Sequence, residues 1–166
     1  MSLNLKKLNE LDQIAFTSAL GWVFEHSPWV AEKAWLKRPF HSVSELHDKM
    51  KNVVNESSMK QKLGLLRAHP DLAARVQMAD ASVKEQSDAG LDQLSKKEHE
   101  EFLSLNETYL TKFAFPFIMA VKGQNKESIQ ASMKERVKNA PDDELREALE
   151  QIYKIAFFRL EDFITT

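Results

Sequence analysis

Helix-breaking residues are scarce in this chain, and their positions divide it into segments of helical length. Only four glycines and five prolines occur among its 166 residues, and almost no stretch alternates apolar with polar side chains. Such alternation is the pattern of a half-buried strand, whereas helices need long stretches without glycine or proline. The sequence therefore predicts an all-α protein, a single-domain bundle of about eight or nine helices spanning residues 1–166.

The starts and ends of these helices have recognisable signals. Ser42, Ser82 and Ser95 are each followed three residues later by a glutamate, which is the form of a capping box. Proline is disfavoured inside a helix, so Pro70 should end one helix and Pro116 should begin another. The predicted helices cover residues 10–24, 28–36, 43–68, 71–79, 82–89, 95–115, 116–122, 128–139 and 142–164.

Charge and composition exclude several classes of protein. The formal net charge of −2 predicts no attraction to nucleic acid or to an anionic membrane. The chain has no cysteine, which excludes disulfides, thiolate catalysis and cysteine-based metal sites. It has no apolar run of about 18 residues that could span a membrane. Because neither a secretory leader nor a peroxisomal Ser-Lys-Leu ending is recognisable, we expect a cytoplasmic location.

His69 is the only one of the five histidines that is followed by proline. It comes three residues after Leu66, on the apolar face that Met59 and Leu63 also predict. Pro70 disfavours a helical conformation for His69, which should therefore lie at a helix end, where the negative pole favours a protonated imidazole. A lone histidine at such a place is more often a helix cap than a catalytic group.

The predicted last helix carries one cation on its apolar face. Its stripe advances by steps of four and three residues through Leu145, Leu149, Ile152, Ala156, Arg159 and Phe163. In a structural role, Arg159 could extend its guanidinium toward solvent or pair with an inner carboxylate. In a functional role, it could hold an anionic substrate with its planar guanidinium. Its position alone favours neither role.

Two further segments have chemical as well as structural interpretations. Ser82 and Glu85 could simply cap a helix, but a capped helix start also presents free N–H groups and a fixed hydroxyl to a ligand; Gln86 has no evident structural purpose. If Pro116 begins a helix, the N–H groups that follow it lack intrahelical acceptors and could bind a carbonyl or an anion. The alternative is a proline kink with the phenylalanine side chains packed in the core.

Together these segments resemble the signature of the OHCU (2-oxo-4-hydroxy-4-carboxy-5-ureidoimidazoline) decarboxylases, which release CO2 in the last step from urate to (S)-allantoin. The resemblance lies in His69-Pro70-Asp71-Leu72-Ala73, in Ser82-Val83-Lys84-Glu85-Gln86 with Ala89-Gly90-Leu91, and in Phe113-Ala114-Phe115-Pro116-Phe117-Ile118. Residues 25–31, 38–40 and 105–109 are also similar to the family in order and spacing.

The resemblance implies roles for individual residues. His69 would be the catalytic proton donor, and Glu85 would orient it or share its proton as well as bind substrate. The remaining substrate-binding positions would be Pro70, Ser82, Gln86, Arg159 and the backbone of Phe117, Ile118, Met119 and Val121.

The resemblance also implies an enzyme that works on a small molecule, OHCU, with no cofactor and no metal. Members of the family are all-helical and often homodimeric, and the reaction follows those of urate oxidase and hydroxyisourate hydrolase. A hydrolase for the preceding step is sometimes fused to the family, but 166 residues are too few to contain it.

Two other functions compete with this hypothesis. A helical carboxylate metalloprotein would need Glu-x-x-His pairs, and the sequence contains neither that pattern nor His-x-x-x-His. A non-enzymatic helical interaction module, in which His69 and Arg159 are merely structural, predicts that no ligand of the pathway raises the melting temperature.

Overall fold

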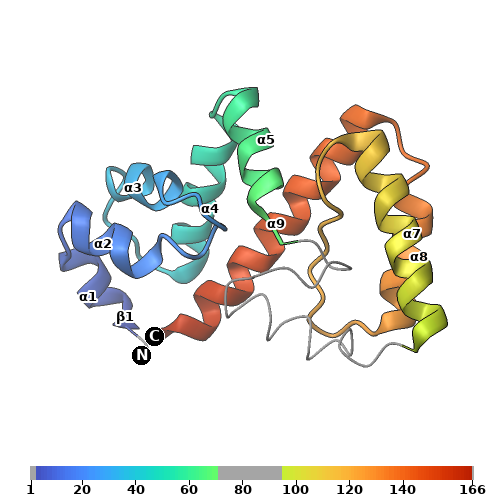
Figure 1. Ribbon diagram of the computed structural model, residues 1–166. Helices are drawn as coiled ribbons and strands as arrows, with labels where there is room; N and C mark the ends of the chain where they lie inside the picture. The colour runs from blue at the N-terminus through green and yellow to red at the C-terminus, as the bar shows by residue number, and fades with distance from the viewer. Residues whose placement is uncertain (1–2, 71–94, 166) are drawn as a thin grey trace. The chain divides into compact units, whose positions relative to one another are not determined.

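The computed structural model describes residues 3–70 and 95–165, and this part of the chain is predominantly helical (Figure 1). Its eight helices are α1 (Leu5–Glu10), α2 (Gln13–Leu20), α3 (Trp29–Trp35), α4 (Val43–Asn55), α5 (Met59–Ala68), α7 (Lys96–Phe113), α8 (Lys126–Arg136) and α9 (Pro141–Phe163). Two short parallel strands, β1 (Leu3–Asn4) and β2 (Ile164–Thr165), pair near the two ends of the chain. The all-α prediction is confirmed. The predicted helices 71–79 and 82–89 lie outside the described residues.

Several helix starts follow the local signals. Ser95 and Glu98 form a complete capping box: the Ser95 hydroxyl accepts from the Glu98 N–H at 3.1 Å, and the Glu98 carboxylate accepts from the Ser95 N–H at 3.0 Å. The Ser42 hydroxyl accepts from the Glu45 N–H at 3.0 Å at the start of α4. Each bond satisfies a backbone donor that the helix itself leaves unpaired.

Two long predicted helices are interrupted. Asp12 accepts from the Ala15 N–H at 2.8 Å and starts α2, so no single helix covers residues 10–24. The predicted helix 43–68 divides into α4 and α5, because Ser58 and Gln61 form a second capping arrangement. The Ser58 hydroxyl accepts from the Gln61 N–H at 3.1 Å, and the Gln61 carbonyl oxygen accepts from the Ser58 N–H at 3.2 Å.

The predicted helix 116–122 is absent, so the prediction that Pro116 begins a helix is wrong. Helix α7 ends at Phe113 and is capped by Ala114, whose φ of 63° is left-handed and whose N–H donates to the Leu110 carbonyl at 2.8 Å. Residues 116–121 then follow a non-helical path to the turn before α8. Side chains from α8 and α9 bond to the backbone of this segment, as described below, and they replace the helical hydrogen bonds that local rules predict.

The chain forms two compact units. One contains Met1–Ala68 with Ile152–Thr166, and the other contains His69–Gln151. In the first, α1 to α5 and the end of α9 bury an apolar core in which the rings of Phe16 and Phe40 stack at 5.7 Å. Within the described residues, no helix is both long enough and apolar enough to cross a membrane.

The second unit has an aromatic core built on α7. The Tyr109 ring lies 4.6 Å from that of Phe113, 5.9 Å from that of Phe115 and 5.3 Å from that of Phe117, and all four side chains are buried. The phenylalanine side chains of the predicted binding segment therefore belong to the core. What the segment can offer to a ligand is its backbone.

Candidate active site

His69 directly follows the last residue of α5, as its sequence context predicted. Its side chain is buried, and so are the neighbouring Pro70 and, one helical turn earlier, Leu66. The expected apolar face is only partly correct, since Leu63 is half-buried and Met59 is 53% exposed. A buried imidazole beside a proline, at the negative end of a helix, is well suited to give a proton to a bound ligand.

The segment Phe115–Val121 contains backbone donors for which the described residues provide no acceptor. Within the described part of the chain, the N–H groups of Phe117, Ile118, Met119 and Val121 donate no hydrogen bond. Phe117 and Ile118 are fully buried, and Val121 is 5% exposed. Buried N–H groups without partners are rare in proteins, and they are suited to bind carbonyl oxygens or anions. The expectation that these amides lack helical acceptors holds, although no helix begins at Pro116.

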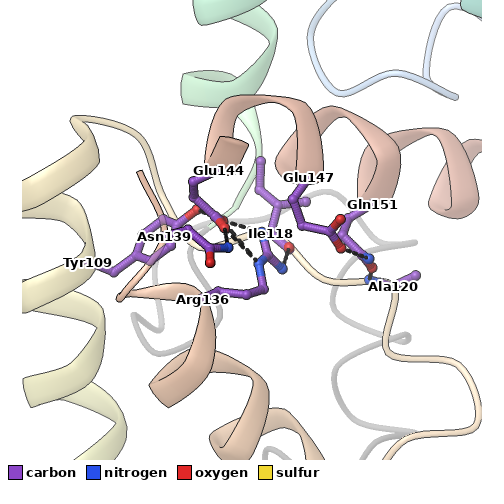
Figure 2. Close-up of polar contacts among 8 residues, drawn as sticks. All are labelled: Tyr109, Ile118, Ala120, Arg136, Asn139, Glu144, Glu147 and Gln151. Atoms are coloured by element: carbon purple, nitrogen blue, oxygen red, sulfur yellow. Dashed lines mark hydrogen bonds and ion pairs between the residues drawn. The ribbon is translucent and has the colours of Figure 1, made fainter. Parts of the chain in front are cut away.

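Two buried side chains contact this segment from neighbouring helices (Figure 2). Arg136, the last residue of α8, donates from Nη1 to the Ile118 carbonyl at 2.5 Å. Gln151, on α9, accepts the Ala120 N–H with its Oε1 at 2.9 Å. Its Nε2 donates in turn to Glu147 Oε1 at 2.8 Å. The segment is thereby held at two positions that are two residues apart.

Glu144 balances the buried charge of Arg136. It is fully buried in the first turn of α9 and accepts from Arg136 Nη2 at 2.6 Å and Nε at 3.0 Å. It also accepts from Asn139 Nδ2 at 3.0 Å and from the Tyr109 hydroxyl. The Arg136 guanidinium lies 4.4 Å from the centre of the Phe117 ring, a cation–π arrangement. Burial, and then the hydrogen bond to Glu144, raise the pKa of Tyr109 above its ordinary value.

Arg136, Glu144 and Gln151 were not predicted from the sequence, although Arg136 has a recognisable signal there. Arg136 follows Ile129 and Met133 by steps of four and three, as Arg159 follows its own apolar stripe, and all three residues are buried. Glu144 is less distinctive, because an acid in the first turn of a helix is ordinary. The general signal is a long polar side chain on the apolar face of a helix.

Arg159 is buried in the first compact unit, where it is 4% exposed. Its Nη2 lies 2.9 Å from Glu25 Oε1, and its Nη1 donates to the Val23 carbonyl at 3.1 Å. Of the two roles that the sequence left open, a partner for an inner carboxylate is present in these contacts. Substrate binding by Arg159 stays a prediction.

Three predicted site residues, Ser82, Glu85 and Gln86, lie outside the described residues. Among the residues that are described, no group of three or more histidine, aspartate or glutamate side chains is placed to hold a metal ion. The described candidate site in the second unit therefore consists of His69, Pro70 and the backbone of residues 117–121, with the Arg136 and Gln151 contacts behind that backbone.

Comparisons with known proteins agree in pointing to one family. The family model described as OHCU decarboxylase matches residues 9–161. The 2-oxo-4-hydroxy-4-carboxy-5-ureidoimidazoline decarboxylase of Haloferax volcanii is 49% identical over 160 residues, which cover 96% of this chain and 95% of that protein. The uric acid degradation bifunctional protein PucL of Bacillus subtilis is 46% identical over 158 residues, which cover 95% of this chain but 32% of that protein.

Solved structures show the same similarity in three dimensions. The crystal structure of an (S)-allantoin synthase matches with a TM-score of 0.83 and 36% identity, and it covers 99% of this chain and 55% of that one. The crystal structure of an OHCU decarboxylase in the presence of (S)-allantoin matches with a TM-score of 0.71 and 25% identity, over 84% of this chain and 93% of that one.

Proposed function

The chain belongs to the OHCU decarboxylase family, and we propose that it converts OHCU to (S)-allantoin and CO2 with His69 as the proton donor. The observation that most strongly supports the proposed reaction is the 49% identity to the Haloferax volcanii decarboxylase over nearly the whole length of both chains. The burial of His69 at the end of α5, beside Pro70, supports its role.

The reaction can proceed without an external electron sink. When the bond between ring carbon 4 and the carboxylate breaks, CO2 leaves and the bonding electron pair moves toward the adjacent ring C=N bond. The ring nitrogen that receives the electrons of the C=N bond takes up one proton. A second proton added to ring carbon 5, together with loss of the 4-hydroxyl proton, then gives the carbonyl and the stereocentre of allantoin. Enzymes that decarboxylate substrates without such a neighbouring bond often recruit a pyridoxal or thiamine cofactor instead.

The backbone of residues 117–121 is suited to bind the ring. Negative charge spreads onto ring nitrogen and oxygen atoms as CO2 leaves, and N–H donors placed at those atoms stabilise the transition state more than the ground state. The N–H groups of the buried residues Phe117, Ile118 and Val121, and of the half-buried Met119, supply donors of this kind within the described residues. The apolar surroundings strengthen each such contact.

His69 would deliver its proton to one face of the ring, which would fix the S configuration of the product. Pro70 would help to hold the imidazole in place. Ser82, Glu85 and Gln86 are assigned here by family motif alone, as contacts to the ring and ureido groups, with Glu85 also orienting His69. Arg159 is assigned in the same way to a polar edge of the substrate.

The proposal also places the protein in a reaction sequence. Two relatives are named uric acid degradation bifunctional proteins, and this chain corresponds to 32% of the length of each. We therefore propose that urate oxidase and hydroxyisourate hydrolase activities supply OHCU. A homodimer and a cytoplasmic location stay predictions, for which light scattering and cell fractionation are direct measurements.

The test follows product chirality rather than loss of substrate, because OHCU also decarboxylates spontaneously to racemic allantoin. OHCU is generated in situ with urate oxidase and hydroxyisourate hydrolase, and circular dichroism follows (S)-allantoin. Wild type should produce the signal rapidly, and His69→Asn should lower kcat by about 100-fold or more.

His41→Asn is the matched control, because the His41 side chain is exposed. This variant should keep full activity. A wild-type rate equal to the enzyme-free rate would refute the proposed reaction. Equal rates for wild type and His69→Asn would remove only the role of His69.

A further inference from the structure

We propose that Gln151 is a positioning residue, which holds the backbone of residues 117–121 in the geometry that binds the reacting ring. The inference rests on the proposed function, and it assigns a role to a side chain that the family motif does not include. Gln151 touches the segment through one bond, from the Ala120 N–H to its Oε1 at 2.9 Å. Figure 2 shows this contact between α9 and the segment.

Glu147 fixes which end of the Gln151 amide faces the segment. A side-chain amide has one accepting oxygen and one donating nitrogen, whereas an ionised carboxylate only accepts. Gln151 Nε2 donates to Glu147 Oε1 at 2.8 Å, so the amide oxygen must point the other way, toward Ala120. A flipped amide would lose both hydrogen bonds. Glu147 and Ala120 together therefore leave Gln151 a single favourable orientation.

The Arg136 contact by itself would not fix the orientation of the segment, and the Gln151 contact fixes it at a second position. Arg136 bonds to the Ile118 carbonyl, and its guanidinium is itself fixed by Glu144. A single contact leaves the chain free to rotate about it, whereas contacts at Ile118 and Ala120 also set the direction of the peptide groups between them. Met119 lies between these two positions, and its N–H donates no hydrogen bond within the described residues.

Gln151 is also the contact that can be removed with least harm to the fold. Arg136 and Glu144 belong to a buried charged network, and a variant of either should strongly destabilise the protein. Gln151 is uncharged and lies in the middle of the 23-residue helix α9. Buried apolar residues of the same helix, such as Ala148 and Ile152, hold the helix in place without it. Its loss should affect the geometry of the segment more than the stability of the protein.

The first test is Gln151→Met, which keeps length and approximate volume but removes both hydrogen bonds. We expect kcat/KM for (S)-allantoin formation to fall by about tenfold or more, mainly through kcat, because misplaced donors stabilise the transition state less well. The melting temperature should fall by only a few degrees. Glu150→Gln is the matched control, since Glu150 is an exposed acid on the same helix and should leave both quantities unchanged.

The second test is a rescue by exchange. Gln151→Glu alone keeps an acceptor for Ala120 but places a second carboxylate beside Glu147, so activity should fall. In the double variant Glu147→Gln with Gln151→Glu, the new amide can donate to the new carboxylate, and the carboxylate still accepts from Ala120. We expect the double variant to recover kcat/KM to within about threefold of wild type, as expected if only positioning was lost.

Hydrogen exchange gives a readout that does not depend on activity. The Ala120 amide should be protected in wild type, exposed to exchange in Gln151→Met and protected again in the double variant.

Wild-type kcat/KM in Gln151→Met, or no recovery in the double variant relative to Gln151→Glu, would overturn the positioning role while leaving the proposed function intact. A wild-type protein that forms (S)-allantoin no faster than the enzyme-free control would overturn both.

Discussion

Replacing Glu144 with glutamine tests the energetics of the buried network directly. The carboxylate is fully buried and accepts from Tyr109, from two nitrogens of Arg136 and from Asn139. A glutamine of the same shape has only one accepting oxygen, so its NH2 group must face a donor. The guanidinium of Arg136 is then left buried without a counter-charge.

Breaking a buried ion pair by removing one partner typically costs about 3–5 kcal/mol. This energy needs no reduction for screening by solvent, because the side chains of Arg136 and Glu144 are only 10% and 0% exposed. The whole free energy of unfolding of a domain is about 5–15 kcal/mol, so this single change should remove a large part of it. With a denaturant slope of about 2 kcal/mol/M, the urea midpoint should fall by about 1.5–2.5 M.

The assay is urea unfolding followed by far-ultraviolet circular dichroism and by tryptophan fluorescence. All three tryptophans, at positions 22, 29 and 35, lie in the first compact unit, whereas Glu144 lies in the second. If the two units unfold together, both probes should report the same shift. If they unfold separately, only circular dichroism should report it.

Asp143→Asn is the matched control, because Asp143 occupies the same first helical turn but is exposed and forms an exposed ion pair with Arg146. We expect its effect to stay within about 0.5 kcal/mol. If Glu144→Gln shifts the urea midpoint by no more than Asp143→Asn does, the buried network does not stabilise the folded protein as its geometry indicates.

Three further predictions concern stability and binding. The pKa of Tyr109 is raised in the folded state, so above about pH 10 only the unfolded state releases this proton. The free energy of unfolding should therefore fall by about 1.4 kcal/mol per pH unit. Alkaline melting curves of Tyr109→Phe should lack this pH-dependent loss. The hydrogen bonds from Lys126 and Ser95 lower the pKa of Glu98, so its contribution should be present above about pH 4.5 and lost as the pH falls further; acid melts of Glu98→Gln should lack this loss. Arg159→Met removes the guanidinium that pairs with the buried Glu25 and should cost about 3–5 kcal/mol. Arg159→Lys should cost less, and a raised KM in the folded Lys variant would support substrate binding.

Local signals in the sequence predicted those elements whose hydrogen bonds close within a few residues. The capping pairs at Ser42 and Ser95 mark helix starts, and His69 lies at the helix end that Pro70 predicts. The division of the predicted helix 43–68 was also readable, because Ser58 and Gln61 have the spacing of a capping box. The apolar stripe of the last helix likewise placed Arg159 on the face that should meet the core, and Arg159 is buried there.

Only the tertiary structure decided the conformation of residues 116–121. Local rules favour a helix that begins at Pro116, but the Ile118 carbonyl bonds to a side chain 18 residues away and the Ala120 N–H to one 31 residues away. These partners lie on α8 and α9, which the fold brings next to the segment. A short stretch of sequence therefore does not show that long-range bonds compete with the helical ones. Because buried backbone groups need partners, the long-range bonds replaced the helical ones at Ile118 and Ala120. The neighbouring N–H groups find no acceptor within the described residues, and their binding of a ligand stays a prediction.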